Sequence, residues 1–188
     1  MSFYFEKANV EQYKAMMKDY DNSFVISEFK KSVLIGSKVL ELGMGIGLDL
    51  LALSKDYNVI GSDQSPLFVE DFQHEHPDHQ VIVCDARDFK LDEKFDCIYS
   101  NKVLYHLNKQ EFVVSLSNQA QHLKANGIIF MTLWNGDHRE DNYEDLIFTY
   151  YRADDIYKLL PTGLSVERML TYSEMEKDNS LLVVLRKQ

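Results

Sequence analysis

The sequence predicts an α/β domain built on a doubly wound, mostly parallel sheet of seven strands that finishes in an antiparallel hairpin. Through the middle of the chain, short apolar segments alternate with segments of helical character, which is the order of a parallel sheet covered on both faces. The apolar segments continue without polar alternation, as strands do when both of their faces are buried. The last two apolar segments are joined by residues 173–179, which are too few and too polar for a crossover helix, so these two strands should pair antiparallel.

The predicted strands follow the apolar segments along the chain. They cover residues 37–42, 57–63, 80–85, 95–101, 128–134, 164–172 and 180–187. Residues 1–35 are expected to form one or two helices, because aromatic residues and methionines lie among charged ones without strand alternation. The polar stretch 135–145 is expected to connect the fifth strand to the last helix.

Local signals mark the remaining helices. Ser65 followed by Pro66 is a favourable helix start. Asn108 and Glu111 form a sequence pattern typical of a capping box, and the Asn126–Gly127 pair marks a stop. Helices are therefore expected at residues 48–55, from Pro66 onward, from Asn108 to about Lys124, and at 154–160 before Pro161.

Length and composition indicate one globular domain, residues 1–188. The chain is long enough for one substantial core and too short for two ordinary domains. It is 45% hydrophobic and 27% charged, as soluble globular proteins are. A formal net charge of −10 opposes a broad phosphate-binding surface, so a nucleic-acid partner is not expected.

The sequence also predicts a cytoplasmic protein without a membrane partner. No segment approaches the roughly 18 uninterrupted apolar residues of a membrane span. Residues 1–14 lack the basic start and apolar middle of a signal peptide. Cys84 and Cys97 lie in apolar strand-like segments, where buried reduced thiols are the simpler interpretation than a disulfide. The oligomeric state is left open.

Three alternate glycines, Gly43, Gly45 and Gly47, interrupt the apolar segment of the first strand just after Glu41. Glycine inside regular structure costs roughly 0.5–1 kcal/mol relative to alanine, so three together indicate that something approaches the backbone there. The loop leaves the carboxyl end of a strand and enters a helix, which is where doubly wound sheets bind nucleotide-like ligands.

Two further acids, Asp63 and Asp85, end the second and third strands. Asp63 lies 20 residues after Gly43, as a ribose-binding acid does in dinucleotide sites. The glycine spacing is G-x-G-x-G rather than G-x-G-x-x-G, and Glu41 would repel a pyrophosphate. Three carboxylates suit a ligand with positive charge and hydroxyl or amino donors.

With these features the chain resembles the class I S-adenosylmethionine-dependent methyltransferases. The resemblance lies in the segments "VLELGMGIG", "VIGSDQS", "VIVCDARDF" and "FDCIYSNKVLYHL", and in the terminal hairpin. It is specific over residues 38–134 and looser beyond them, and residues 1–35 match only as a helical lid. It implies the methyltransferase fold, S-adenosylmethionine as cofactor and S-adenosylhomocysteine as product.

The resemblance also implies roles for individual residues around the cofactor. The three glycines would pass beneath its methionine part, and Glu41 would hold its ammonium group. The other implied contacts are Asp63 with the ribose hydroxyls, Gln64 beside the adenine, Asp85 with the adenine amino group, the Ala86 N–H with a ring nitrogen, and Asn101 with the methionine part.

Other chemistry-bearing residues have two interpretations each. His106 is either a general base with a pKa suited to neutral pH or a packed residue that orients the loop. Tyr4, Tyr13, Tyr20 and Trp134 are candidate substrate contacts, although core packing is the alternative for the tyrosines.

Two histidine-bearing segments are not expected to form sites. His138 and Arg139 are expected to be exposed loop residues, with substrate binding as the alternative. The histidines of "HEHPDH", residues 74–79, fit no ligand spacing, and no metal is predicted.

The sequence therefore predicts an enzyme that transfers a methyl group to a small-molecule acceptor. The segment after the fourth strand reads "SNKV" and lacks the N/D-P-P-Y/F pattern of amide and exocyclic amino methylation. The alternatives are a non-catalytic member of the fold that binds cofactor or a partner protein, a methyltransferase acting on protein or nucleic acid, and a nicotinamide-dependent reductase.

Overall fold

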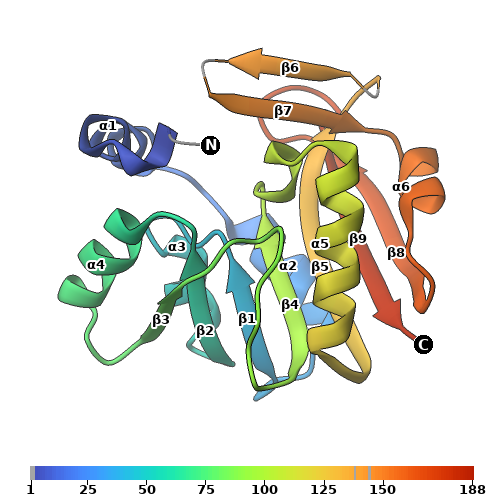
Figure 1. Ribbon diagram of the computed structural model, residues 1–188, viewed down its shortest axis with the longest axis horizontal. Coiled ribbons are helices and arrows are strands. Elements are labelled where there is room, and N and C mark those ends of the chain that lie inside the picture. Colours follow the sequence, from blue (N-terminus) through green and yellow to red (C-terminus); the bar gives the residue numbers. More distant parts are fainter. Residues whose placement is uncertain (1–2, 138, 144) are drawn as a thin grey trace.

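The computed structural model describes residues 3–137, 139–143 and 145–188 (Figure 1). Its main sheet contains the seven predicted strands: β1 (Lys38–Leu42), β2 (Asn58–Asp63), β3 (Gln80–Val83), β4 (Phe95–Asn101), β5 (Leu123–Asn135), β8 (Leu164–Tyr172) and β9 (Ser180–Lys187). The helices are α1 (Lys7–Met17), α2 (Ser23–Ser32), α3 (Leu48–Leu53), α4 (Pro66–Glu75), α5 (Lys109–His122) and α6 (Ala153–Leu159), with single turns at Phe3–Phe5 and Leu104–His106.

The order of the strands confirms the predicted fold class. β3, β2, β1, β4 and β5 lie side by side and parallel, and β9 then pairs antiparallel with β5 and with β8. The chain direction across the sheet reverses between β1 and β4, so a switch point lies at the carboxyl ends of these two strands. The β8–β9 hairpin is the predicted antiparallel ending.

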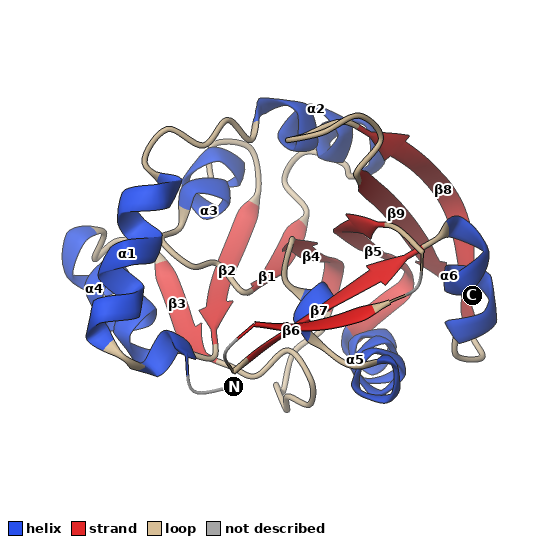
Figure 2. Cartoon of the chain, turned by 90° about the horizontal axis from the view of Figure 1, so that it is seen from above, coloured by secondary structure: helices blue, strands red, loops and turns tan. Residues whose placement is uncertain are grey.

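The two faces of the sheet carry separate apolar layers. On one face, α5 contributes Phe112 and Leu116 to a core that includes Ile98 and Ile129. On the other face, Phe29 of α2 packs against the sheet, and α3 and α4 form a smaller cluster beside it. Viewed from above, α2 and α5 lie on opposite sides of the sheet (Figure 2).

The capping box predicted for α5 is confirmed. Asn108 accepts a hydrogen bond from the backbone N–H of Glu111 at 3.0 Å, and the Glu111 carboxylate accepts one from the Asn108 N–H at 3.1 Å. The helix ends at His122, two residues before the predicted end, because Leu123 already begins β5.

The N-terminal segment divides into two parts with different positions. The Phe3–Phe5 turn and α1 lie above the carboxyl edge of the sheet (Figure 1). In contrast, α2 belongs to the core, because the Phe29 ring is fully buried and contacts Tyr57, Tyr99 and Phe130 edge-on. No residue of α2 lines the cavity at this edge.

The polar stretch 135–145 is not a simple connection, contrary to the expectation from the sequence. It contains a strand, β6 (Glu140–Tyr143), which pairs antiparallel with β7 (Leu146–Tyr151). β6 is exposed along its whole length, so it has no apolar periodicity from which it could be predicted. The β6–β7 hairpin lies above the carboxyl ends of β4 and β5 (Figure 1), and β7 runs parallel to the last residues of β5.

None of the helices in the described ranges combines the length and the apolar character that are needed to cross a bilayer.

Candidate active site

A cavity of about 440 Å³ opens at the carboxyl edge of the parallel strands, a volume typical of small-ligand sites. The N-terminal segment, the ends of β1 to β5 and the β8–β9 connection all contribute to its wall. All but one of the predicted site residues line it: Tyr4, Tyr13, Tyr20, Glu41, Gly43, Gly45, Asp63, Gln64, Asp85, Ala86, Asn101, His106 and Trp134. The exception is Gly47.

The glycine loop is fixed by backbone conformation and by packing. Gly43, Gly45 and Gly47 have φ values of 71°, 52° and 78°, in the left-handed region that glycine adopts without strain. A Cβ atom on Gly43 would lie 2.5 Å from Cγ2 of Val103, and one on Gly47 would lie 2.1 Å from Cε2 of Phe72. Gly47 is therefore required for packing of α3 against α4. Gly45 instead faces Tyr13, and a Cβ atom on Gly45 would lie 3.2 Å from Cε1 of Tyr13.

Asp63 is buried and held by backbone donors. Its Oδ2 accepts a hydrogen bond from the Gly45 N–H at 3.0 Å, and its Oδ1 accepts one from the Ser65 N–H at 2.9 Å. Burial raises the pKa of Asp63 to about 6, against the opposing effect of these hydrogen bonds. The carboxylate thus ties the glycine loop to the start of α4 and keeps lone pairs for a ligand.

Glu41 lies at the floor of the cavity and is 2% exposed. Its Oε2 atom has no hydrogen-bond partner among the described residues. Burial, with Asp49 and Asp63 nearby, raises the pKa of Glu41 well above its ordinary value. A buried carboxyl group without a partner is costly, and a cationic ligand group would relieve that cost.

Asp85 lines the cavity beside Ala86, but its carboxylate is already paired. Nε of Arg87 donates to Oδ1 and Oδ2 at 3.0 and 2.9 Å, and a terminal nitrogen of Arg87 donates to Oδ2 at 2.5 Å. These hydrogen bonds and the guanidinium charge outweigh the burial of Asp85 and lower its pKa. An adenine amino group would therefore have to share this carboxylate with Arg87.

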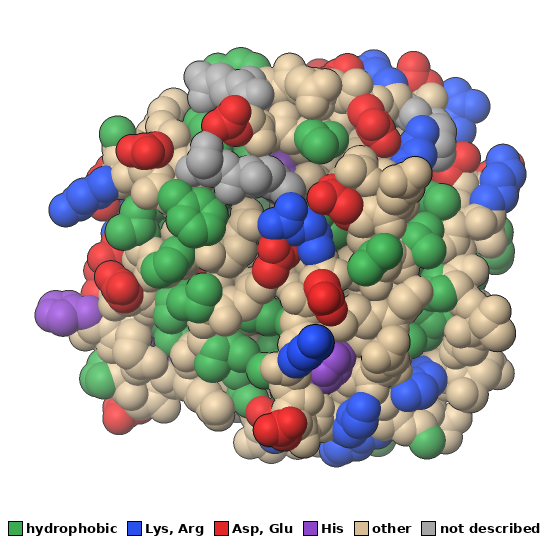
Figure 3. Space-filling model, in the orientation of Figure 1, with side chains coloured by type: hydrophobic (Ala, Val, Ile, Leu, Met, Phe, Trp, Pro, Cys, Tyr) green, Lys and Arg blue, Asp and Glu red, His purple; other side chains and the backbone are tan. Residues whose placement is uncertain are grey.

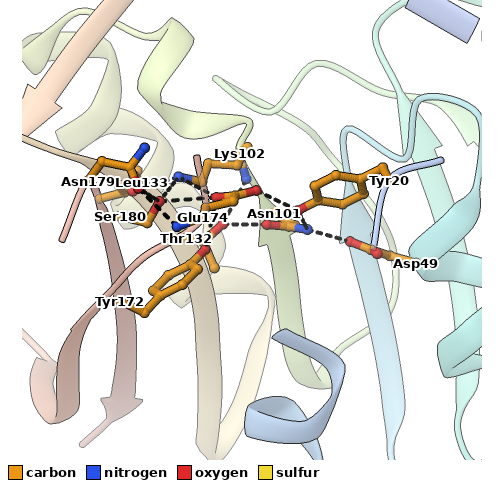
Figure 4. Close-up of polar contacts among 10 residues, drawn as sticks. All are labelled: Tyr20, Asp49, Asn101, Lys102, Thr132, Leu133, Tyr172, Glu174, Asn179 and Ser180. Carbon is orange, nitrogen blue, oxygen red and sulfur yellow. Dashed lines mark hydrogen bonds and ion pairs between the residues drawn. The ribbon is translucent and has the colours of Figure 1, made fainter. Parts of the chain in front are cut away.

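Asn101 and Asp49 connect the end of β4 to α3 and to the N-terminal segment (Figure 4). Asn101 Nδ2 donates to Asp49 Oδ2 at 2.9 Å, and Thr132 donates to Asn101 Oδ1 at 2.5 Å. The same Asp49 carboxylate accepts hydrogen bonds from Asn22 and Tyr99, each at 2.6 Å. Asp49 was not predicted as a site residue, although its place one residue into the helix after the glycine loop is a usable signal.

Lys102 and Glu174 form an ion pair of 3.0 Å that the sequence did not reveal (Figure 4). The Lys102 ammonium also donates to the Ser180 hydroxyl at 2.7 Å and to the Leu133 carbonyl at 3.2 Å. It lies 3.3 Å from the centroid of the Trp134 ring, within cation–π distance. Lys102 has a φ of 54°, an uncommon conformation for a residue other than glycine.

Burial lowers the pKa of Lys102 to about 8, although Glu174 opposes this shift. Glu174 Oε1 accepts a hydrogen bond from the Tyr20 hydroxyl at 2.8 Å, which links the β8–β9 connection to the N-terminal segment. Both side chains are mostly buried, Lys102 at 12% exposure and Glu174 at 17%.

His106 is a weaker base than the sequence suggested. Nδ1 lies 2.9 Å from the carbonyl oxygen of Ile147 in β7, and because a carbonyl only accepts, Nδ1 carries the proton. Burial lowers the pKa of His106 to about 4, so the imidazole is neutral near pH 7 with an unprotonated Nε2. The β6–β7 hairpin therefore decides the tautomer of this residue.

The predicted tyrosines lie over the cavity rather than in a separate core. The Tyr4 and Tyr13 rings contact each other and Phe68 of α4, with centroids 5.5 to 5.8 Å apart. Ser65 donates to the Tyr4 carbonyl at 2.6 Å, and Lys14 pairs with Asp71 at 2.6 Å. Residues 3–17 are thus attached to α4.

The histidines other than His106 were not expected to bind a metal. No group of three or more His, Cys, Asp or Glu side chains suited to a metal ion occurs in the described part of the chain. His138 lies outside the described residues, and Arg139 lies over the Tyr150 ring, 4.4 Å from its centroid. On the face drawn in Figure 3, acidic and basic side chains are interspersed rather than gathered into a basic surface.

Comparison with known proteins identifies a family for the central part of the chain. Residues 39–127 match the family described as "Methyltransferase domain". No curated protein sequence matches the chain.

Solved structures share the fold over nearly the whole chain. A TehB-like S-adenosylmethionine-dependent methyltransferase from Corynebacterium glutamicum is 21% identical with a TM-score of 0.78, covering 97% of this chain and 100% of its own. The 1,6-didemethyltoxoflavin N1-methyltransferase of Burkholderia thailandensis is 14% identical with a TM-score of 0.80, covering 96% and 84%. The N-methyltransferase NodS of Bradyrhizobium japonicum is 15% identical with a TM-score of 0.75, covering 98% of both chains. The match over residues 39–127 agrees with the predicted family and class of enzyme, and the shared fold confirms the predicted fold class.

Proposed function

We propose, from the premise that residues 39–127 form a methyltransferase domain, that the chain transfers the methyl group of S-adenosylmethionine to a small-molecule acceptor. The methyl donor follows from the family; the NodS and didemethyltoxoflavin enzymes were crystallised with its product, S-adenosylhomocysteine. The observation that carries the proposal is the unpartnered, buried Glu41 oxygen at the floor of the cavity.

The residues present fit this cofactor. Glu41 would receive the ammonium group, which supplies the partner that its Oε2 atom lacks. Asp63 would accept from the ribose hydroxyls, since its carboxylate keeps free lone pairs beside the glycine loop. The adenine would lie between the ends of β2 and β3, against Gln64 and Ala86.

The cofactor, when bound, supplies an electrophilic methyl group on its sulfonium. The chain then has to hold the acceptor in line with that methyl group and keep water out, and such positioning supplies several kcal/mol. Asn101 would face the methionine part from the end of β4. His106 would accept a hydrogen bond from the acceptor through Nε2, and its lowered pKa keeps the imidazole neutral and available for that contact.

We further propose that residues 1–188 act as one domain in which residues 3–17 are the lid. Tyr4 and Tyr13 line the cavity and pack on Phe68, so movement of this segment would open the cofactor half to solvent. The cytoplasmic location expected from the sequence belongs to the same proposal, and cell fractionation tests it.

A small-molecule acceptor fits a cavity of about 440 Å³ better than a macromolecule does. The didemethyltoxoflavin enzyme, which is similar in fold, was crystallised with a small-molecule acceptor. The net charge of −10 opposes nucleic acid as an acceptor. A non-catalytic cofactor-binding protein is the second candidate, and release of S-adenosylhomocysteine over a metabolite panel distinguishes the two.

Calorimetric titration with S-adenosylmethionine tests the site. We expect Asp63→Ala to weaken binding on the order of 100-fold, because the variant loses charged hydrogen bonds to the ribose and loosens the glycine loop. Asp78→Ala, at an exposed position after α4, should bind as the wild type does. Equal binding by wild type and Asp63→Ala, or no binding by the wild type, would contradict the proposed site.

A further inference from the structure

The cofactor half of the cavity leaves the other half for the acceptor. The glycine loop follows β1, Asp63 ends β2 and Ala86 lies after β3. The opposite wall is formed by Lys102, Trp134 and the β8–β9 connection. The chemistry of this second wall therefore determines which acceptor can bind. This inference about the acceptor rests on the proposed function.

The lysine in this wall is fully engaged within the protein. The three protons of the Lys102 ammonium have three acceptors: Glu174, Ser180 and the Leu133 carbonyl (Figure 4). The ring of Trp134 covers a further side of the ammonium. Lys102 is therefore a positioning residue that joins β4, β5 and the β8–β9 connection, and it is not free to bind an anionic acceptor.

Acidic side chains outnumber basic ones in the cavity wall. Among the described residues that line it, six are carboxylic acids (Asp19, Glu41, Asp49, Asp63, Asp85 and Glu174), and Lys102 is the single lysine or arginine. A carboxylate or phosphate group in the acceptor half would face this charge without a free cation. Anionic acceptors are therefore disfavoured.

Glu174 offers a binding position for a cation. Its Oε1 accepts a hydrogen bond from Tyr20, and each carboxylate oxygen has two lone pairs, so Oε1 can accept another. The side chain is held in place by Lys102 and Ser180 through Oε2. At 17% exposure it is reachable from the cavity, yet screened enough for a charge interaction to count.

Aromatic and methionine side chains line the cavity on the same side as Glu174. Trp134 and Tyr105 form one side, with ring centroids 5.9 Å apart. Met16, Met17 and Met175 lie around the opening, and the first and last of these are 69% and 81% exposed. Aromatic faces and flexible methionine side chains suit the body of an organic cation.

We propose that the acceptor is a small amine with an apolar or aromatic body, and that Glu174 anchors its amino group. The amine enters as an ammonium ion and loses one proton to solvent base. Its nitrogen lone pair then forms the N–CH₃ bond while the C–S bond breaks and its electron pair returns to sulfur. The product amine carries one positive charge until it releases a second proton, and the sulfonium becomes a neutral thioether.

Three probes that share a phenyl ring and a two-carbon chain test the choice of acceptor: 2-phenylethylamine, phenylacetate and 2-phenylethanol. Each is titrated into protein saturated with S-adenosylhomocysteine, and the fluorescence of Trp134, the single tryptophan of the chain, reports binding. Calorimetry with S-adenosylhomocysteine comes first, so that failure of the cofactor site is seen separately from failure of the acceptor inference. We expect the amine to bind at least about 10-fold more tightly than either matched probe.

Two variants test whether Glu174 causes the preference for the amine. Glu174→Gln keeps the size of the side chain and removes the charge, and should abolish the preference for the amine without changing S-adenosylhomocysteine affinity. Glu176→Gln, an exposed residue of the same connection, should keep the preference. Equal binding of the three probes, preference for phenylacetate, absence of amine binding, or a preference that survives Glu174→Gln would each overturn the proposal. The wild-type comparison decides the matter even if Glu174→Gln fails to fold.

Discussion

The two halves of the cavity are built in different ways. In the cofactor half, the contacts join residues that are close in sequence: Gly45 and Asp63 are 18 residues apart, and Asp63 and Ser65 are two apart. In the acceptor half, Lys102 and Ser180 are 78 residues apart, and Tyr20 and Glu174 are 154 apart. The first half is therefore encoded in short motifs, while the second exists only after distant segments have met.

The halves also differ in how their charges are satisfied. Glu41 in the cofactor half keeps an unpartnered oxygen, whereas Lys102 in the acceptor half has a partner for each of its protons. A buried acid without a partner can bind a ligand group, whereas a fully paired ion network fixes the positions of the segments that it joins. The predictions below test this difference, from the largest effect to the smallest.

The largest effect is expected at Gly47. Gly47→Ala should reduce the free energy of unfolding by about 2–4 kcal/mol, because the new Cβ meets Phe72 and the backbone is left-handed. Urea unfolding followed by Trp134 fluorescence measures it. The matched control is Gly36→Ala, which has a similar φ of +82° but open space around the Cβ, and should lose only about 1–2 kcal/mol. Equal losses in the two variants would show that the contact between residue 47 and Phe72 does not contribute to the loss of stability.

The second effect is the release of a proton from Glu41 when the cofactor binds. Because the pKa of free Glu41 is raised well above its ordinary value, an ammonium group bound beside it should ionise it and release a proton. Calorimetric titration with S-adenosylmethionine near pH 7, above the pKa of about 6 for Asp63 and where an α-amino group is mostly protonated, should therefore give a binding enthalpy that depends on the ionisation enthalpy of the buffer.

Glu41→Gln is the matching variant. It should remove the buffer dependence and weaken binding on the order of 10- to 100-fold. A binding enthalpy that is the same in all buffers for the wild type would contradict the proposed contact between Glu41 and the ammonium group.

The smallest effect, taken per pH unit, is a pH dependence of stability from Lys102. Its pKa falls from 10.5 in the unfolded chain to about 8 in the fold, so the folded state binds fewer protons between these values. The free energy of unfolding of the wild type, relative to Lys102→Met, should therefore rise with pH from about 8 to 10.5, by roughly 1 kcal/mol per pH unit.

Taking the difference between the two proteins cancels groups that titrate in both, such as Cys84, whose pKa is raised to about 11. Lys90→Met removes a positive charge at an exposed position and serves as the control. A difference that is flat, or that falls as pH rises, would mean that burial of Lys102 does not outweigh its ion pair with Glu174.

Sequence reasoning recovered the seven main strands and most of the cavity wall because these depend on local patterns. Continuous apolar segments specify buried strands, and strand ends at a common edge bring Glu41, Asp63 and Asp85 together. It missed β6 because a fully exposed strand has no periodic signal. It missed the pairing of Asp85 with Arg87 because the strand pattern predicts the position of Asp85 but not the side chain to which its carboxylate is hydrogen-bonded.

The sequence by itself determined the fold class, the switch point and the row of acids above it, since each of these follows from periodicity and from residues at strand ends. Only the tertiary structure decided the acceptor half, where Lys102, Glu174 and Tyr20 meet across the molecule, and the tautomer of His106, which the Ile147 carbonyl fixes. The physical reason is that hydrogen bonds and burial depend on which atoms lie within a few ångströms, and for residues more than 100 positions apart that proximity is a product of the whole packed sheet.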